Sequence, residues 1–271
     1  MAKRRAPLDI KVLPGFASMA VICLLVLYVP ILVLMLFSFN SGNIVTHWEG
    51  ISLHWYGVAL QNDEFFSAAE NTMIIAVSAT VIATSVATLA ALGMTRVKPW
   101  KGLTAAFMVL NLPLMVPEIV TAVATLSFFA LIAGKLGLNF GIGNLIIAHT
   151  VFCIPFAYMP IKARLEDMDT TLDHAAADLY APPWKTFRRI TLPLLAPGIM
   201  SGAALSFIVS FDDFTITQLV AGPGQTTLPL YIWNQIRRPM TPEINAISTI
   251  LLMVSIVLVA VSFLVTLKKR R

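Results

Sequence analysis

Long uncharged apolar stretches alternate with short polar segments along the whole chain. Such a stretch is close to or longer than the roughly 20 residues that an α-helix needs to cross the hydrocarbon core of a bilayer. The pattern predicts an all-α membrane protein that forms a single transmembrane domain over residues 1–271. The six predicted transmembrane helices lie near residues 16–38, 70–94, 103–133, 143–161, 196–217 and 244–267.

The third stretch, 103–133, is too long for one straight span and contains two prolines, Pro113 and Pro117, followed directly by Glu118. Proline removes a backbone hydrogen bond from a helix and clashes with the preceding turn. The spacing therefore predicts a helix that breaks near its middle and continues at another angle.

Basic residues divide unevenly between the two sides of a six-span chain. Sixteen fall on one side, and only Lys135, Arg237 and Arg238 fall on the other. Cytoplasmic loops of membrane proteins carry the excess of Lys and Arg. Both termini and the loop 162–195 are therefore expected in the cytoplasm. The apolar part of the first span is longer than a signal-peptide core, so we expect this span to stay in the protein.

Composition supports a membrane protein and excludes several other classes. Hydrophobic residues make up 58% of the chain, charged residues only 12%, and the mean hydropathy is +0.81, whereas soluble domains carry about 25% charged residues. A soluble enzyme, a disordered tail and a nucleic-acid-binding module are excluded. Cys23 and Cys153 lie inside apolar stretches without CxxC spacing, which predicts neither a disulfide framework nor a metal site.

The cytoplasmic loop predicts two short helices separated by a break. Thr170 and Asp173 have the spacing of a capping box, and an apolar stripe follows at helical spacing. Pro182 and Pro183 end the first helix, and the second can begin at Pro183. A helix outside the membrane must cover its stripe, either against its own spans or against a partner. The stripe consists of Leu172, Ala175, Ala176 and Leu179.

This segment resembles the EAA loop of bacterial ABC importer permeases, which reads Glu-Ala-Ala, three residues, Gly, nine residues, Ile, one residue, Leu-Pro. The chain has His174 in place of the Glu and Tyr180 in place of the Gly. We expect the first change to affect a polar contact with the ATPase, and the second to remove the flexible turn, which Pro182 and Pro183 would replace. The matching residues are Ala175, Ala176, Ile190, Leu192 and Pro193.

The resemblance extends over nearly the whole chain and is greatest to the spermidine/putrescine permeases, in particular to the second permease subunit of such systems. It is carried by FSFNSG near residue 40, WYG at 55–57, LPLMVPEIVT at 112–121, SFDDFTIT at 210–217, AGPGQTTLPLYIW and TPEINA. It implies a type I ABC importer permease fold with a cytoplasmic coupling helix, in the bacterial inner membrane.

The resemblance also implies partners. These are a second permease subunit that completes the pathway, two cytoplasmic ATPase subunits that bind ATP and magnesium, and a periplasmic polyamine-binding protein that meets the loops at 39–69 and 218–243. The chain itself would contact membrane lipid, no nucleic acid, and no cofactor of its own. No GxxxxGK[ST] phosphate loop and no HExxH or GxSxG motif occurs, so we expect no enzyme activity from this subunit.

Only three charged side chains lie well inside the predicted spans, and all three are acidic: Glu118, Asp212 and Asp213. A charged residue at the bilayer centre costs roughly 2.5 to 3.5 kcal/mol on insertion scales, so it normally faces a cavity, a partner or a pathway. With no Lys or Arg in the spans, a cationic cargo would supply the countercharge, which favours a polyamine.

The three acids have alternative roles. Adjacent helical residues point about 100° apart, so we expect one of Asp212 and Asp213 to line the pathway and the other to anchor a neighbouring span. Glu118 serves either the pathway or the broken helix beside it. His149 is expected to be an interhelical hydrogen-bonder. The rival functions are an importer for a sugar, an iron complex or an oxyanion, and an ion-gradient carrier.

Overall fold

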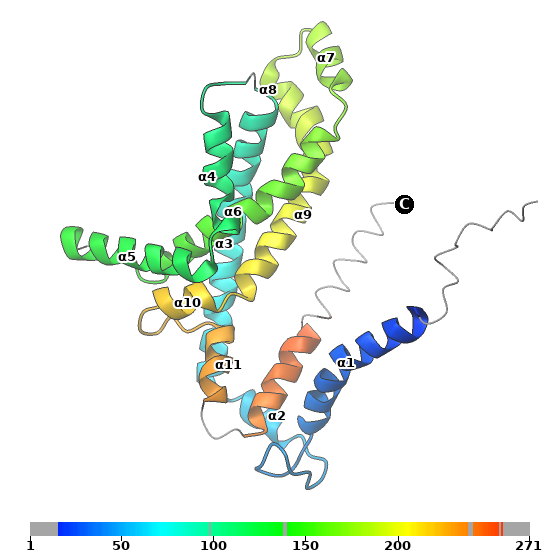
Figure 1. Cartoon of the computed structure of the whole chain (residues 1–271), viewed down its shortest axis with the longest axis vertical. Helices are drawn as coiled ribbons and strands as arrows, with labels where there is room; N and C mark the ends of the chain where they lie inside the picture. The colour runs from blue at the N-terminus through cyan, green and yellow to red at the C-terminus, as the bar shows by residue number, and fades with distance from the viewer. Residues whose placement is uncertain (1–15, 98, 138–139, 238–240, 255, 257–271) are drawn as a thin grey trace, which may run out of the picture. The chain divides into compact units, whose positions relative to one another are not determined.

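The computed structural model describes residues 16–97, 99–137, 140–237, 241–254 and 256, and these residues form helices joined by turns and loops (Figure 1). Within them, five helices are long and apolar enough to cross a membrane: Ala17–Phe37, Asp63–Thr95, Glu118–Lys135, Ile142–Glu166 and Pro183–Phe211. The predicted sixth span begins as the helix Glu243–Val254, and the rest of it, except Ile256, lies outside the described residues. The chain divides into two compact units.

One unit combines Met1–Asn62 with Gln235–Arg271. It holds α1 (Phe16–Phe37), α2 (His54–Ala59) and the helix Glu243–Val254. The loop between α1 and α2 is organised by the buried side chain of Asn40, whose amide nitrogen donates to the carbonyl of His47 at 2.6 Å and whose oxygen accepts from the amide of Glu49 at 2.9 Å. One asparagine thereby satisfies backbone groups on both sides of the loop.

The other unit, Asp63–Asn234, is built on three long helices that pack against one another: α3 (Asp63–Thr95), α6 (Ile142–Glu166) and α9 (Leu192–Phe211). Small residues make the close approach possible. Along α9, small buried residues recur every four positions as Gly198, Gly202, Ser206 and Ser210. Along α3, five alanines are fully buried: Ala76, Ala79, Ala83, Ala87 and Ala91.

The seam between α6 and α9 requires glycine at its centre. A side-chain carbon at position 202 would lie 2.7 Å from the carbonyl oxygen of Ala157. Above this contact, the hydroxyl of Ser206 donates to the carbonyl of Cys153 at 3.3 Å. The two backbones are therefore too close for any larger residue, which fixes the position of α9 on α6.

The predicted break in the third stretch is confirmed. Helix α4 (Leu103–Met115) ends before Val116, whose backbone is extended, and α5 (Glu118–Leu136) begins directly after Pro117. The residue before a proline is forced out of the helical region, which explains the extended Val116. Figure 1 shows α5 leaving the direction of α4 at a steep angle. Pro113 is accommodated within α4.

The predicted fifth span, 196–217, was wrong as one continuous helix. The helix begins earlier, with α8 (Pro183–Thr186) and the π-helical turn η2 (Phe187–Thr191) running into α9, and it ends at Phe211. A separate short helix, α10 (Thr215–Val220), follows and then α11 (Leu228–Ile236). Helix α6 also extends to Glu166. The segment between the long helices is thus 167–182, shorter than the predicted loop 162–195.

Candidate functional site

The segment between α6 and α8 forms the short helix α7 (Thr171–Asp178). The predicted capping box was wrong, because Thr170 has helical backbone angles and makes no side-chain cap. Instead, Asp169 accepts a hydrogen bond from the amide of Thr171 at 2.9 Å. This bond favours the charged carboxylate and lowers the pKa of Asp169. Asp169 has the better position because it still lies outside the helical turn.

Tyr180 forms the turn at the end of α7 in the place of the family glycine. Its φ is +55°, the only positive φ at a non-glycine among the described residues. The amide of Tyr180 donates to the carbonyl of Ala177 at 2.9 Å, and that of Ala181 to Ala176 at 3.0 Å. These two bonds define a Schellman motif. The expected loss of the turn was wrong: Tyr180 adopts the left-handed conformation itself, and Pro183 then begins α8.

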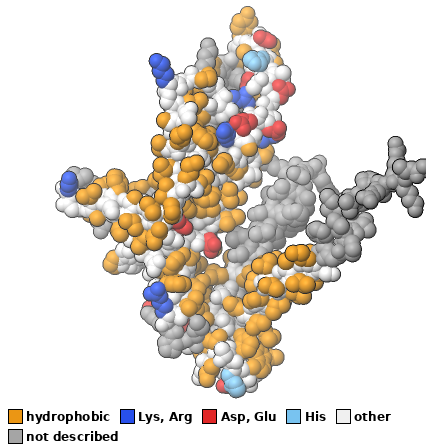
Figure 2. All heavy atoms as spheres, viewed as in Figure 1, with side chains coloured by type: hydrophobic (Ala, Val, Ile, Leu, Met, Phe, Trp, Pro, Cys, Tyr) orange, Lys and Arg blue, Asp and Glu red, His pale blue; other side chains and the backbone are white. Residues whose placement is uncertain are grey.

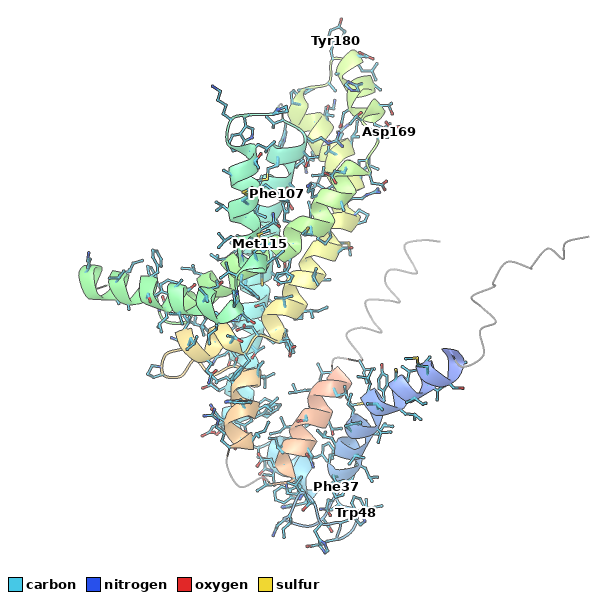
Figure 3. All side chains as sticks on the ribbon, viewed as in Figure 1. Phe37, Trp48, Phe107, Met115, Asp169 and Tyr180 are labelled. Carbon is cyan, nitrogen blue, oxygen red and sulfur yellow. The ribbon has the colours of Figure 1, made fainter. Side chains whose placement is uncertain are left out.

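The apolar stripe of α7 lies largely open. Ala176 is buried, whereas Leu172, Ala175 and His174 are exposed, and Leu179 is 82% and Tyr180 96% exposed. Figure 3 shows Tyr180 at the tip of the loop that joins α7 to α8. Within its own unit, the described residues therefore leave most of this surface uncovered, as expected for a contact surface.

The remaining residues of the motif lie where this segment joins the long helix. Ile190 is half-buried in η2, Leu192 is half-buried at the start of α9, and Pro193 is exposed in its first turn. Charged side chains gather at this end of the unit, while hydrophobic ones cover most of its middle (Figure 2). The motif thus connects the exposed tip to the base of α9.

The acidic cluster lies where α9 ends and α10 begins. Asp213 is only 6% exposed. One of its carboxylate oxygens accepts from the amide of Ile216 at 3.3 Å, and the other accepts from the amide and the hydroxyl of Thr217 at 3.0 and 3.1 Å. Asp213 therefore caps α10, and this competition with the helical backbone accounts for the break that the pattern of apolar residues did not predict.

His149 of α6 connects this cap to the rest of the unit. Its Nδ1 lies 2.8 Å from the hydroxyl of Ser210, and its Nε2 lies 3.1 Å from the hydroxyl of Thr217 and 3.3 Å from the carboxylate of Asp213. His149 is the interhelical hydrogen-bonder that its position in the span predicts. Its pairing with Asp213 was missed, because the two residues are distant in sequence. The packing of α9 on α6 brings Ser210 to His149, and the turn between α9 and α10 brings Asp213 to it.

Glu118 and Asp212 complete the cluster in different ways. The half-buried carboxyl of Glu118, in the first turn of α5, interacts with the side chains of Asp213 and Thr215. Helix α10 packs on α5 beside it. Asp212 terminates α9 and is exposed. The structure thus brings Glu118 and Asp213 together, gives Asp213 the anchoring position, and leaves Asp212 open. The pathway roles of these acids stay predictions.

The five long apolar helices, the bundle of α3, α6 and α9 and the projecting α7 together define the type I fold of an ABC importer permease. A bacterial ABC transporter involved in the import of the acidic polysaccharide alginate has a chain of this fold, with a TM-score of 0.69 and 18% identity over 93% of this chain and 94% of that one. Residues 83–270 match the family model of the binding-protein-dependent transport system inner membrane component. The chain belongs to this family of multi-pass inner-membrane permeases.

Curated relatives match over most of their length. The putrescine transport system permease protein PotI of Escherichia coli (strain K12) is 38% identical over 228 residues, which are 83% of this chain and 81% of the relative. The spermidine/putrescine transport system permease protein PotC of the same strain is 35% identical over 245 residues, 90% and 91% of the two chains. PotC of Haemophilus influenzae is 36% identical over 242 residues, 89% and 92%.

Proposed function

We propose that this chain is a transmembrane permease subunit of an ATP-driven importer for polyamines, putrescine or spermidine, and forms half of the translocation pathway. The observation that carries the proposal is the similarity, 35–38% identity over more than four-fifths of each chain, to permeases named for putrescine and spermidine transport. The aligned regions span 83% and 90% of this chain.

The two helix breaks give this cargo a physical basis. The break between α4 and α5 and the break between α9 and α10 lie next to each other, because α5 packs on α10. Discontinuous helices mark the binding sites of many transporters. The exposed carboxylate of Asp212 stands at the C-terminal end of α9, where the helix dipole also favours a cation. The negative electrostatic potential at this helix end would attract the ammonium groups of a polyamine.

The same proposal implies the other subunits of the importer. A second permease subunit completes the pathway, a periplasmic polyamine-binding protein delivers the cargo, and two ATPase subunits bind ATP and magnesium and receive α7. This subunit has no cofactor and no catalytic activity of its own. Both termini and α7 face the cytoplasm, in accord with the basic residues at the α7–α8 end.

Uptake of radiolabelled putrescine into membrane vesicles that contain the full complex tests the proposal. We expect Asp212→Asn to lower uptake about tenfold, the equivalent of roughly 1.4 kcal/mol of lost attraction, at unchanged abundance in the membrane. Asp212→Glu keeps the charge and serves as the matched control that retains uptake. A wild-type complex that carries a neutral or anionic solute but neither polyamine would overturn the proposal.

A further inference from the structure

Three helix ends meet at a single carboxylate at the base of α7. The guanidinium Nη1 of Arg96, directly after α3, lies 3.4 Å from Oδ2 of Asp173 in the first turn of α7. The hydroxyl of Thr191, the last residue of η2, donates to Oδ1 of the same carboxylate at 3.3 Å. Both oxygens of Asp173 are thus engaged, each by a different helix.

This contact is partly withdrawn from solvent. The side chains of Arg96 and Asp173 are 21% and 29% exposed, and Thr191 is buried. Nε and Nη2 of Arg96 are also buried, and they find no acceptor within the described part of the chain. The salt bridge to Asp173 is therefore the main compensation for a guanidinium that has lost much of its hydration. It differs from the exposed pair between Arg164 and Asp167, whose carboxylate is 83% exposed.

The position of the contact gives it mechanical consequences. Helix α7 packs on α8 and η2, and η2 continues without interruption into α9. Single π-helical turns are often found at functional sites. Asp173 connects the same α7 to the end of α3. A rigid displacement of α7 is thereby transmitted to two of the three long helices of the unit, which both pack on α6.

We propose that Asp173 is the positioning residue through which movement of α7 reaches α3 by way of Arg96 and α9 by way of Thr191. It couples ATP hydrolysis to opening of the pathway and touches neither ATP nor cargo. This inference rests on the proposed function as an ATP-driven importer subunit. Asp173 precedes His174 and acts within the subunit. Within the described residues, the exposed tip at Leu179 and Tyr180 has no such contact with α3 or α9 and is available to a partner.

The test uses the complete complex in proteoliposomes, with putrescine uptake and ATP hydrolysis measured on the same sample. Asp173→Asn and Arg96→Gln should each lower the number of cargo molecules moved per ATP by about tenfold, within the usual range of coupling between sites, while the ATPase subunits still co-purify. The exchange of both charges, Arg96→Asp with Asp173→Arg, should restore much of the ratio. Asp167→Asn removes an exposed Asp–Arg pair and should leave the ratio unchanged.

A transport ratio that is normal in both single variants, or equally low in the charge exchange, overturns the inference. Loss of assembly in the single variants also overturns it, because Asp173 would then be a folding contact. A second measurement separates this result from failure of the proposed cargo. The distance between spin labels at Leu89 on α3 and Asp178 on α7 should change differently on addition of ATP in Asp173→Asn and in wild type. Identical changes overturn the link even if putrescine is not the cargo.

Discussion

The α7 tip and the acidic cluster of α9 and α10 differ in how much of their surface and hydrogen bonding the chain itself completes. The tip presents Leu179 and Tyr180 almost fully to the outside. In the cluster, Asp213 has four hydrogen-bonding or ionic contacts with buried partners and is nearly inaccessible. An exposed apolar surface is typically covered by a partner, whereas buried polar groups need their hydrogen-bond partners within the chain. The first region is suited to communication and the second to holding helices in place.

The same difference separates two neighbouring residues. Asp212 and Asp213 are identical in chemistry and adjacent in sequence, yet one is exposed and the other buried. The carboxylate of Asp213 caps α10 and contacts His149. We therefore expect its substitution to lower the stability of the fold. Asp212 is exposed, and under the proposed function we expect its substitution to act on cargo. Chemical type alone therefore does not identify a pathway residue, and its hydrogen-bonding partners have to be counted first.

The largest effect is expected from breaking the buried network at Asp213. Asp213→Ala leaves the amides of Ile216 and Thr217 without their acceptor and removes the carboxylate beside Nε2 of His149, and unsatisfied buried groups are costly. We expect a loss of about 3 kcal/mol in the free energy of unfolding, measured as a lower thermal midpoint of the detergent-solubilised protein. Asp212→Ala is the control and should change this midpoint little. Equal midpoints for the two variants would contradict the division of roles.

A second, smaller loss of stability is expected at the seam that supports the cluster. Gly202→Ala places a methyl group 2.7 Å from the carbonyl oxygen of Ala157, which forces α6 and α9 apart. Overpacking of this kind costs about 1 to 3 kcal/mol. Gly134→Ala in α5 meets no atom within 4 Å and should be neutral or slightly stabilising. Thermal unfolding of both variants checks the prediction. An unchanged midpoint for Gly202→Ala would contradict it, because α6 and α9 would then accommodate the methyl group without loss of stability.

Some of these features could be predicted from sequence, and the reasons differ by residue. The break after Met115 follows from Pro117, because proline acts locally on its own backbone. The exposed tip follows from the resemblance of Ala175, Ala176 and their neighbours to a known motif. The break at Asp212 does not follow, because an acidic pair in an apolar stretch is compatible with a lumen, a cap or an ion pair. Choosing among these requires the position of His149, which only the packing of α6 on α9 supplies.

The α7 tip should respond in binding and not in stability. Leu179→Asp puts a charge on a side chain that is 82% exposed, so the free energy of unfolding of the subunit should change little. We expect the affinity for the ATPase subunits to fall about tenfold, or roughly 1.4 kcal/mol, with an unchanged thermal midpoint. Leu60→Asp, at another exposed leucine, should bind normally. Co-purification and titration of the ATPase measure this. Normal binding by Leu179→Asp would remove the tip from the interface.

The smallest effect concerns the turn that carries the tip. Tyr180 occupies a left-handed backbone position in a Schellman motif, which glycine adopts without strain and a β-branched residue does not. Tyr180→Gly should therefore leave the thermal midpoint unchanged or raise it slightly, while Tyr180→Val should cost about 1 kcal/mol. Since the Tyr180 side chain is 96% exposed, its loss alone removes little packing, and the two variants isolate the backbone contribution. If Tyr180→Val were as stable as Tyr180→Gly, the turn would not depend on the left-handed conformation, and the exposed tip would owe its shape to Pro182 and Pro183 instead.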